Sequence, residues 1–473
     1  MPKDKQFPAG ATPGFPLGTG WGEQLVRARA RGRVPAYNLS AMLLSAWLVV
    51  LPWRAAAEPV LTDAEKIRNL VTQIATGDFA ARERAVKALE ALGEEHAPLW
   101  EKERQASNDP EVRERLGTLL ARYRPGEMLW KYGAGQVVSS PAIVDGRVYF
   151  GSFDNHFYCL SAQDGSLVWR FAAGEFRSSP AVAGGRVYTG CLDKKFYCLD
   201  AATGKPVWEF KAGDEIFTSP LVVDGKVYFS CNDRKVYCLN SKDGSKIWEY
   251  QTGACPDDGE GYWSSPAIDA GRVFIGSTDQ KIYCLDANTG RKVWDFQAGG
   301  GVDATPAVCG ERLVVGAAKD ALYCLSSRDG KMLWKMTNAA SRISSAAISE
   351  GKVYVGSHDR QIYCHALEDG KILWAVMTGD EVQASPAVVG GRVFVATYDH
   401  YLRCLDPATG KGLWKFPMQE MSFSSPALAG CSVIFGSYDG NVYCVRSGVR
   451  GPKDWPCFGE NAQRTRSPVP KGK

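Results

Sequence analysis

From residue 128 to residue 447, apolar and polar positions alternate in short runs that are separated by glycine-containing turns. The four strands expected in the first unit cover residues 140–144, 147–152, 157–162 and 167–171. Asp145-Gly146 joins the first two, and Asp-Gly suits a tight hairpin because both central positions need positive φ. Period-two alternation in runs of this length predicts four antiparallel strands per unit.

The unit recurs eight times, and two markers count it independently. One is a proline at residues 141, 180, 220, 266, 306, 386 and 426, with Ala346 in the remaining slot. The other is Trp130, Trp169, Trp208, Trp248, Trp294, Trp334, Trp374 and Trp414. Successive tryptophans are 39 or 40 residues apart, except for one step of 46 where residues 254–261 are inserted. Four strands in a unit of this length form a propeller blade, so an all-β, eight-bladed β-propeller is predicted over residues 128–447.

The order of the markers also predicts how the ring closes. The chain enters the propeller with a tryptophan strand, 128–132, and leaves it after a third strand, 442–446. The first of these therefore completes the eighth blade, which joins the two ends and removes an open sheet edge.

Residues 58–125 follow a period of 3.6 instead of two, which predicts three or four short amphipathic helices. Thr62 and Asp78 are expected to cap the first two, and Gly93 ends the second. Asp109-Pro110 opens a further helix, since proline is well tolerated in a first turn. The segment resembles a HEAT-type helix pair. It is expected to serve either as an interaction platform or as a cap packed on the propeller.

The first 57 residues have the order of a targeting segment. A leader rich in glycine and proline precedes a stretch with four arginines, then an apolar run over 39–53, then Ala55-Ala56-Ala57. This predicts a signal peptide cleaved before Glu58 and an exported, periplasmic or extracellular protein. The alternative is an uncleaved membrane anchor formed by residues 39–53, although a span needs about 20 apolar residues.

Composition adds little to this prediction but narrows the partners. The 50 glycines and 14 tryptophans suit short strands and tight turns. The net charge of +4 is mild, and no run of five like charges occurs, so a nucleic-acid partner is not indicated. The five histidines show no metal-ligand spacing. The propeller is expected to be monomeric.

The repeat resembles a known family. The second unit contains Ser179-Pro180 with Gly185, then Tyr197-Cys-Leu-Asp, and then Thr203-Gly-Lys with Trp208. This pattern is similar to the pyrroloquinoline-quinone-like repeat, which quinoprotein alcohol dehydrogenases share with the propeller lipoprotein of the outer-membrane β-barrel assembly machinery. The resemblance covers residues 128–447 and implies that each tryptophan docks between neighbouring blades. The tail, 448–473, contains a segment similar to one that often precedes the first blade, and we expect it along the outside of the ring.

Eight cysteines occupy one repeat position: Cys159, Cys198, Cys238, Cys284, Cys324, Cys364, Cys404 and Cys444. Such a ring could bind a metal or carry redox chemistry. The favoured interpretation is that each is a small buried apolar residue, too far from its neighbours for a disulfide. One disulfide remains open among Cys191, Cys231, Cys255, Cys309, Cys431 and Cys457.

A repeated aspartate precedes each cysteine by five residues in seven blades: Asp154, Asp193, Asp233, Asp279, Asp359, Asp399 and Asp439. In the fifth blade Asp320 is displaced by one position. These carboxylates could form a cation site, but the favoured interpretation is that each caps its own turn by accepting backbone N–H groups.

The resemblance to the quinoproteins does not extend to the residues that those enzymes use for catalysis. Those enzymes use a pair of adjacent cysteines, a calcium site and a catalytic aspartate, on blades with long insertions. This chain has no Cys-Cys pair, no Cys-x-x-Cys-His motif and seven minimal units, and no nucleophile motif of the Gly-x-Ser-x-Gly type with a partnered histidine is evident. No catalytic residue, metal or cofactor is therefore predicted. A degenerate quinoprotein dehydrogenase is the alternative.

Function is expected on the connectors that run from each tryptophan strand to the next blade, around the central channel. Their candidate partner-binding residues are Phe176, Arg177, Glu215, Phe217, Tyr262, Trp263, Asp303, Arg342, Glu381, Gln383 and Phe423. Aromatic and charged side chains together suit recognition of a protein or another cell-envelope component, or of a glycan. The alternative is that several of them fill the channel. The insertion 254–261 is a further candidate for contact with a partner.

Overall fold

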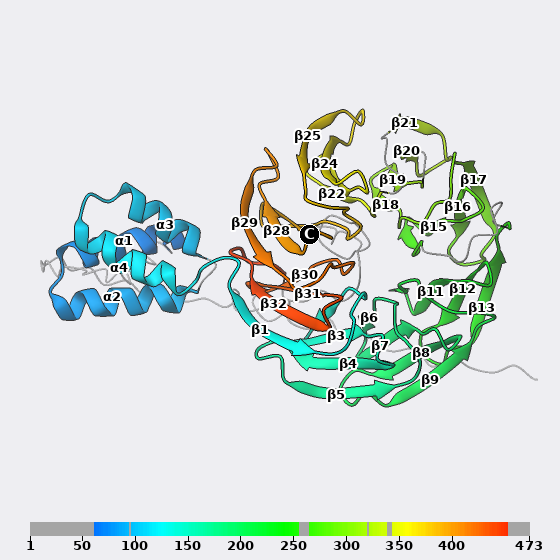
Figure 1. Cartoon of the computed structure of the whole chain (residues 1–473), viewed down its shortest axis with the longest axis horizontal. Helices are drawn as coiled ribbons and strands as arrows, with labels where there is room; N and C mark the ends of the chain where they lie inside the picture. The colour runs from blue at the N-terminus through cyan, green and yellow to red at the C-terminus, as the bar shows by residue number, and fades with distance from the viewer. Residues whose placement is uncertain (1–60, 94–95, 255–263, 319–320, 338–342, 453–473) are drawn as a thin grey trace, which may run out of the picture. The chain divides into compact units, whose positions relative to one another are not determined.

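The computed structural model describes residues 61–93, 96–254, 264–318, 321–337 and 343–452. Eight four-stranded antiparallel sheets stand radially around a central channel (Figure 1). Within seven blades the strands pair in chain order from the channel outward, and in the eighth the outermost strand is β1 from the start of the propeller. The predicted eight-bladed propeller is confirmed.

The strand bounds are as follows. Blade 1 has β2 (Ala142–Val144), β3 (Arg147–Gly151), β4 (His156–Ser161) and β5 (Leu167–Ala172). Blade 2 has β6 (Ala181–Ala183), β7 (Arg186–Gly190), β8 (Lys195–Asp200) and β9 (Pro206–Lys211). Blade 3 has β10 (Leu221–Val223), β11 (Lys226–Cys231), β12 (Lys235–Asn240) and β13 (Lys246–Gln251). Blade 4 has β14 (Ala267–Asp269), β15 (Arg272–Gly276), β16 (Lys281–Asp286) and β17 (Lys292–Gln297).

The second half of the ring repeats this order. Blade 5 has β18 (Ala307–Cys309), β19 (Arg312–Gly316), β20 (Leu322–Ser326) and β21 (Met332–Met336). Blade 6 has β22 (Ala347–Ser349), β23 (Lys352–Gly356), β24 (Gln361–Ala366) and β25 (Ile372–Met377). Blade 7 has β26 (Ala387–Val389), β27 (Arg392–Ala396), β28 (Tyr401–Leu405) and β29 (Gly412–Pro417). Blade 8 has β30 (Ala427–Ala429), β31 (Ser432–Gly436), β32 (Asn441–Arg446) and β1 (Met128–Gly133).

The eighth blade closes the ring as predicted. Its outermost strand, β1, comes from the start of the propeller and pairs antiparallel with β32, with Trp130 opposite Cys444. The first and last strands of the propeller therefore hold each other, and the sheet order β1-β32-β31-β30 is the same as in a blade made from continuous chain.

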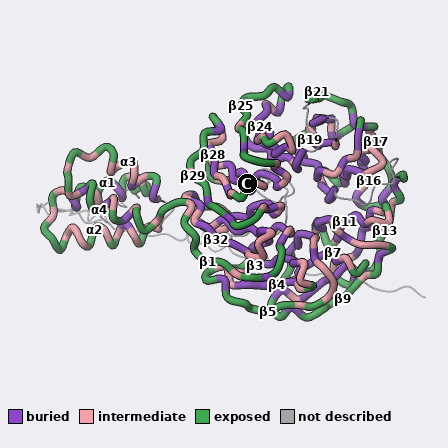
Figure 2. Tube along the Cα trace, in the orientation of Figure 1, coloured by how far each residue is buried: buried purple, intermediate pink, exposed green. Residues whose placement is uncertain are grey.

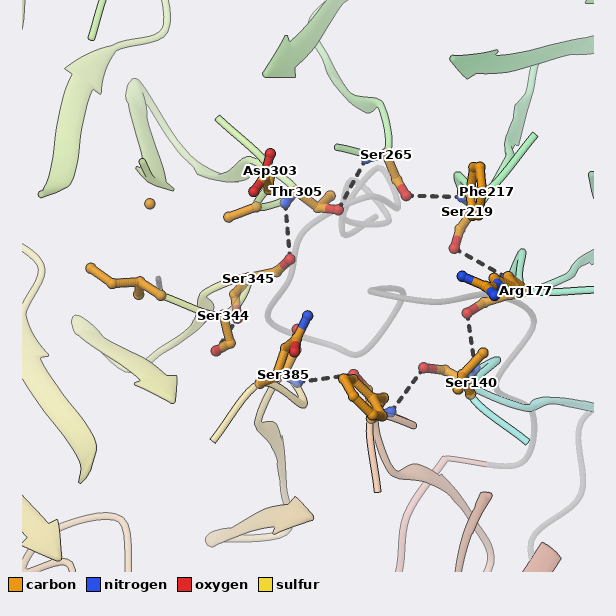
Figure 3. A pocket seen from close by; sticks show the side chains of 18 of the residues that line it. Ser140, Arg177, Phe217, Ser219, Ser265, Asp303, Thr305, Ser344, Ser345 and Ser385 are labelled. Atoms are coloured by element: carbon orange, nitrogen blue, oxygen red, sulfur yellow. Dashed lines mark hydrogen bonds between the residues drawn. The ribbon is translucent and has the colours of Figure 1, made fainter. Parts of the chain in front are cut away.

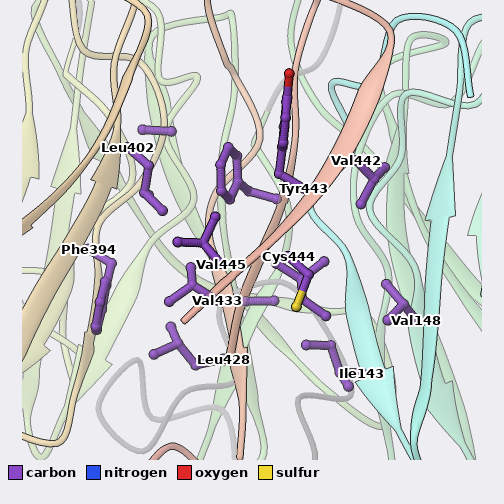
Figure 4. Close-up of a cluster of buried hydrophobic side chains, with 14 of the residues drawn as sticks. Ile143, Val148, Phe394, Leu402, Leu428, Val433, Val442, Tyr443, Cys444 and Val445 are labelled. Carbon is purple, nitrogen blue, oxygen red and sulfur yellow. The ribbon is translucent and has the colours of Figure 1, made fainter. Parts of the chain in front are cut away.

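The hydrophobic core lies between neighbouring blades rather than at one centre. In Figure 4, Phe394 and Leu402 of blade 7 and Ile143 and Val148 of blade 1 flank side chains of blade 8 such as Val433. The inner strands are buried on both faces, whereas the outermost strands are largely exposed (Figure 2). Each blade is thus stabilised by the two blades beside it, because a closed ring gives every blade two neighbours.

The tryptophans dock between blades, as the family resemblance implied. Trp248 is 8% exposed, and its indole N–H donates to the carbonyl oxygen of Ala287 in the next blade, 3.1 Å away. Equivalent bonds to the next blade's backbone are made by Trp130, Trp169, Trp208, Trp294, Trp334 and Trp374. Gly290 faces the ring of Trp248 with φ +69°, and a Cβ there would lie 2.7 Å from the indole. Glycine therefore meets two requirements at this turn, a left-handed backbone and space for the ring.

The repeated aspartates cap turns, as the favoured interpretation held. In blade 3 the Asp233 carboxylate accepts the backbone N–H of Lys235 at 3.1 Å and the hydroxyl of Tyr237 at 2.5 Å. The same pair of bonds occurs at Asp154, Asp193, Asp279, Asp359 and Asp439. In blade 7 Arg403 takes the place of the tyrosine and donates to Asp399. Asp320 lies outside the described residues.

The eight repeat cysteines are buried side chains within strands, as predicted. Each is fully buried, and each is a free thiol. Burial raises the pKa of all eight, to about 11 or about 12, because the thiolate would lose its hydration. Cys191 and Cys231 are also free thiols, whereas Cys255 and Cys457 lie outside the described residues.

The helical segment forms four helices with a small core of its own. They are α1 (Asp63–Thr76), α2 (Phe79–Leu92), α3 (Ala97–Ala106) and α4 (Pro110–Ala121). Thr62, Asp78 and Asp109 cap α1, α2 and α4 as predicted. The sequence did not place α3, whose Trp100 is fully buried in this core. Among the described residues, no helix has the length and apolar character needed to cross a membrane.

Candidate functional site

The described connectors reach the channel through two residues that stand three and four positions before the marker proline. In the connector to blade 2 these are Phe176 and Arg177. The Phe176 side chain is 0% exposed and packs over Gly151 of blade 1, where a Cβ would lie 2.4 Å from it. Arg177 faces the channel instead. Because successive side chains of an extended segment point to opposite sides, the first residue of each pair that the structure describes in full belongs to the core and the second to the channel.

This alternation sorts the predicted site residues. A cavity of about 400 Å³ at the channel mouth is lined by Arg177, Phe217, Asp303, Gln383 and Phe423 (Figure 3). Phe176 does not lie where the sequence predicts: its side chain is buried between blades instead of facing the channel. Glu215 and Glu381 are half-buried and do not line this cavity. Tyr262, Trp263, Arg342 and most of the insertion lie outside the described residues.

A second ring of cavity residues was missed from sequence. It occupies the position just before the repeated aspartate, in the turn between the second and third strands. Tyr398, Tyr438, Phe153 and His358 hold this position in blades 7, 8, 1 and 6. Tyr438, Phe153 and His358 line the cavity, and the ring of Tyr398 packs against Phe423, which also lines it. The backbone N–H of Tyr398 donates to the carbonyl of Glu381, which fixes turn and connector together. A comparison of the residue before each aspartate would have shown aromatic rings in four consecutive blades.

The two rings of residues meet in a continuous aromatic surface. The ring centroids of Tyr398 and Phe423 are 4.7 Å apart, those of Phe423 and Tyr438 are 5.0 Å apart, and those of Tyr438 and Phe153 are 6.1 Å apart. His358 extends the series, with its centroid 6.4 Å from that of Tyr398. Centroids at these distances are in favourable contact.

Arg177 continues the surface on its other side. Its guanidinium carbon lies 4.5 Å from the ring centroid of Phe153 and 5.3 Å from that of Phe217, so it is held between the two rings. Glu175 lies 3.7 Å from the same guanidinium. We call this set the aromatic arc: His358, Tyr398, Phe423, Tyr438, Phe153, Arg177 and Phe217. It draws on six neighbouring blades, from blade 6 through blade 8 to blade 3.

The remaining side of the channel mouth is different. At the position of Phe153 and Tyr438, blades 3, 4 and 5 carry Asn232, Thr278 and Ala318. Asp303 supplies a carboxylate to the cavity wall there. The site therefore has one aromatic side with a cation and one side of small and polar residues.

Beneath both sides runs a ring of hydroxyl groups. In seven blades, the residue just before the marker proline donates its backbone N–H to the hydroxyl oxygen of the equivalent residue in the next blade (Figure 3). The bonds measure 2.9 to 3.3 Å and include those from Ser140, Ser179, Ser219, Ser265, Thr305, Ser385 and Ser425. They satisfy buried backbone groups in the wall of the cavity, which stabilises this wall.

Other polar contacts hold the aromatic arc in place. His358 Nδ1 lies 3.1 Å from the Glu381 carboxylate, and the Tyr398 hydroxyl donates to the amide oxygen of Gln383. Burial raises the pKa of Tyr438, so its hydroxyl is neutral at physiological pH. Among the described residues, no group of three His, Cys, Asp or Glu side chains gathers as a metal-ligand set.

Solved structures show the same fold. BamB from Moraxella catarrhalis is 19% identical with a TM-score of 0.59, and the match covers 67% of this chain and 99% of that one. The computationally designed Ika8 protein is 16% identical with a TM-score of 0.61, covering 68% and 100%. The quinohemoprotein alcohol dehydrogenase from Comamonas testosteroni is 16% identical with a TM-score of 0.56, covering 69% and 77%. At these identities the likeness establishes the fold alone.

The family assignment comes from the sequence comparison. No curated protein matches the chain in sequence. A family model described as outer membrane protein assembly factor BamB matches residues 112–188, 159–261, 256–348 and 322–455. These segments span the entire propeller and more than two thirds of the chain. The chain therefore belongs to the family of the outer membrane protein assembly factor BamB.

Proposed function

We propose that this protein is an exported, non-catalytic scaffold whose propeller binds a protein partner at the channel mouth. The family name supports an assembly role in the cell envelope, with partners in the outer-membrane protein assembly machinery. The observation that carries the proposal is the aromatic arc, a run of ring contacts ending in a cation held between two rings.

The chemistry of the arc indicates what kind of segment it takes. Half-buried aromatic rings offer large contact area at little entropic cost, and aromatic residues and arginine dominate binding energy at protein interfaces. Stacking between Phe153 and Phe217 orients the Arg177 guanidinium, so little freedom is lost when it pairs with a carboxylate. The partner segment is accordingly an extended peptide with an apolar or aromatic side chain next to an acidic residue.

Site-specific photo-crosslinking tests this proposal. A photoreactive phenylalanine analogue at position 423 should give a discrete adduct with an envelope protein. The same analogue at Leu413, an exposed side chain on the outer strand β29, should not. Equal labelling from both positions would argue against a site at the channel mouth.

Affinity then measures the contribution of the arc. Arg177→Ala should weaken binding of the crosslinked partner roughly tenfold, the loss expected for one charge-assisted hydrogen bond. Asn232→Ala, at the position equivalent to Phe153 on the small polar side, is the matched control and should bind like the wild type. The proposal fails if the two substitutions have the same effect while both proteins keep the wild-type melting temperature.

The quinoprotein alternative has a direct test. The quinohemoprotein alcohol dehydrogenase shares the fold, so titration with pyrroloquinoline quinone and calcium distinguishes the two functions. Tight, saturable and calcium-dependent binding would favour a redox enzyme. Absence of such binding would favour the proposed non-catalytic scaffold. Glycan-array binding that Phe423→Ala abolishes would instead identify a carbohydrate ligand at the same rings.

A further inference from the structure

The outermost strand of every blade is a sheet edge. Among the described residues, the fourth strand of each blade pairs on one side only, so a row of its backbone N–H and C=O groups has no strand partner at the rim (Figure 1). Such an edge pairs readily with another strand unless charged side chains or proline prevent it. The eight rim strands can therefore be compared position by position for this protection.

Seven of the rim strands carry a charge at their middle position, directly after the tryptophan. These residues are Lys131, Arg170, Glu209, Glu249, Asp295, Lys335 and Lys415. In blade 6 the position holds Ala375. Strand β25 reads Ile-Leu-Trp-Ala-Val-Met and contains neither a charged residue nor a proline anywhere in its length. Blade 6 is thus the one blade whose rim strand lacks this protection.

The same strand presents an apolar face to solvent. Leu373, Ala375 and Met377 are exposed, whereas Trp374 and Val376 are partly buried. Leu373 is 48% exposed and Met377 is 66% exposed. At the position of Met377 the other blades carry Gly133, Ala172, Lys211, Gln251, Gln297, Thr337 and Pro417, none of which is a large apolar side chain.

We propose that the rim edge of blade 6 pairs with the same edge of a second copy of this chain. An antiparallel pair of β25 strands about a two-fold axis at Ala375 places alanine opposite alanine. It also places Leu373 of each chain opposite Met377 of the other, so the most exposed apolar side chains of the strand cover each other. Eight strands in two blades then form one continuous sheet.

Self-complementarity is what selects a second copy as the occupant. A two-fold pairing places the middle residue opposite its own copy. At any of the other seven edges this would oppose two like charges, Lys415 to Lys415 for example, which is unfavourable. Only β25 can pair with itself without that cost. A six-residue strand pair is a small interface, so the dimer is weak and depends on concentration. This departs from the monomeric propeller expected from the sequence.

Sedimentation equilibrium of the full chain tests the proposal. The wild type should show a reversible monomer–dimer equilibrium. Ala375→Lys should weaken dimerisation about tenfold or more, because two lysines would face each other across the axis. The matched control is Lys415→Glu, a charge change at the same position of blade 7, which should leave the dimerisation constant unchanged.

A charge-complementation experiment keeps the test independent of folding defects. Chains with Ala375→Lys and chains with Ala375→Glu should each be monomeric alone, and a mixture of the two should form a heterodimer. Recovery in the mixture requires that both variants are folded and that position 375 faces itself. The proposal is overturned if the wild type stays monomeric, if Ala375→Lys dimerises as the wild type does, or if the mixture forms no dimer.

Discussion

The tryptophans on the outermost strands and the residues at the channel mouth belong to the same repeat. The first are identical in every blade, whereas the second differ from blade to blade. At the rim every blade carries the same tryptophan, and seven of these tryptophans donate their indole N–H to a backbone carbonyl of the next blade. At the channel mouth the equivalent position is Arg177 in one blade, Phe217 in the next and Asp303 in another. Positions that all blades share hold the ring together, whereas positions that differ are free of that demand and can serve a partner.

The largest expected effect separates these two regions directly. Trp248→Ala should lower the free energy of unfolding by about 4 kcal/mol, because it removes a buried aromatic ring and leaves the carbonyl of Ala287 without its indole donor. Phe423→Ala at the channel mouth should cost less than about 1 kcal/mol, since its ring is only half-buried. Urea unfolding followed by circular dichroism measures both. Equal losses of unfolding free energy in the two variants would contradict the proposed difference between the rim and the channel mouth.

The next effect concerns the glycine that faces the tryptophan. Gly290→Ala should cost about 3 kcal/mol, because the new Cβ would lie 2.7 Å from the Trp248 ring on a backbone with φ +69°. Gly271→Ala has a similar φ of +73° but no atom within 4 Å, so it should cost only about 1 kcal/mol. Their difference in urea unfolding isolates the steric part. Similar values for both would show that the ring adjusts freely.

Alkaline pH tests a shared position inside the blades. Burial raises the pKa of Cys238 to about 12, above its ordinary value of 9.0. Its stabilising contribution is therefore complete below pH 9 and is lost as the pH rises towards 12, because the thiol ionises only in the unfolded chain. Relative to Cys238→Ala, the wild type should lose about 1 kcal/mol between pH 9 and pH 10. A constant difference between the two proteins over this range would contradict the burial argument.

The smallest effect comes from a blade that departs from a shared position. His365 is fully buried in blade 6, where blades 1 to 5 and blade 7 carry leucine, and its Nδ1 lies 2.9 Å from the carbonyl of Gly370. Burial lowers its pKa, so it contributes stability above pH 6.5 that is lost as the pH falls. At pH 6 the loss should be less than about 1 kcal/mol, and His365→Leu should remove it. Unfolding curves at pH 6 and pH 8 would show whether the variant abolishes this dependence.

Local signals explain how much of the fold could be predicted. The Asp-Gly turns, the tryptophans and the caps Thr62, Asp78 and Asp109 each act within a few residues, so the sequence indicates them directly. Helix α3 was not placed because the residue at its N-cap position, His96, provides no side-chain cap. The cysteine and aspartate rings were interpreted correctly because burial and turn-capping follow from position within a single strand or turn.

The site was predicted only in part, for a different reason. Arg177, Phe217, Asp303 and Phe423 were expected at the channel and do line its cavity. Phe176 was misplaced because which of two adjacent connector residues turns inward is set by the space above Gly151, a residue of the preceding blade. That space is not apparent from the connector itself.

The sequence by itself determined the number of blades, the strands within them and the strand that closes the ring, because each depends on a pattern that recurs along the chain. Only the tertiary structure decided which side chains meet at the channel mouth. Phe153 and Tyr438 stand at opposite ends of the repeat array, yet closure through β1 and β32 brings their rings within 6.1 Å. A closed ring makes its first and last blades neighbours, and with them the two halves of the aromatic arc.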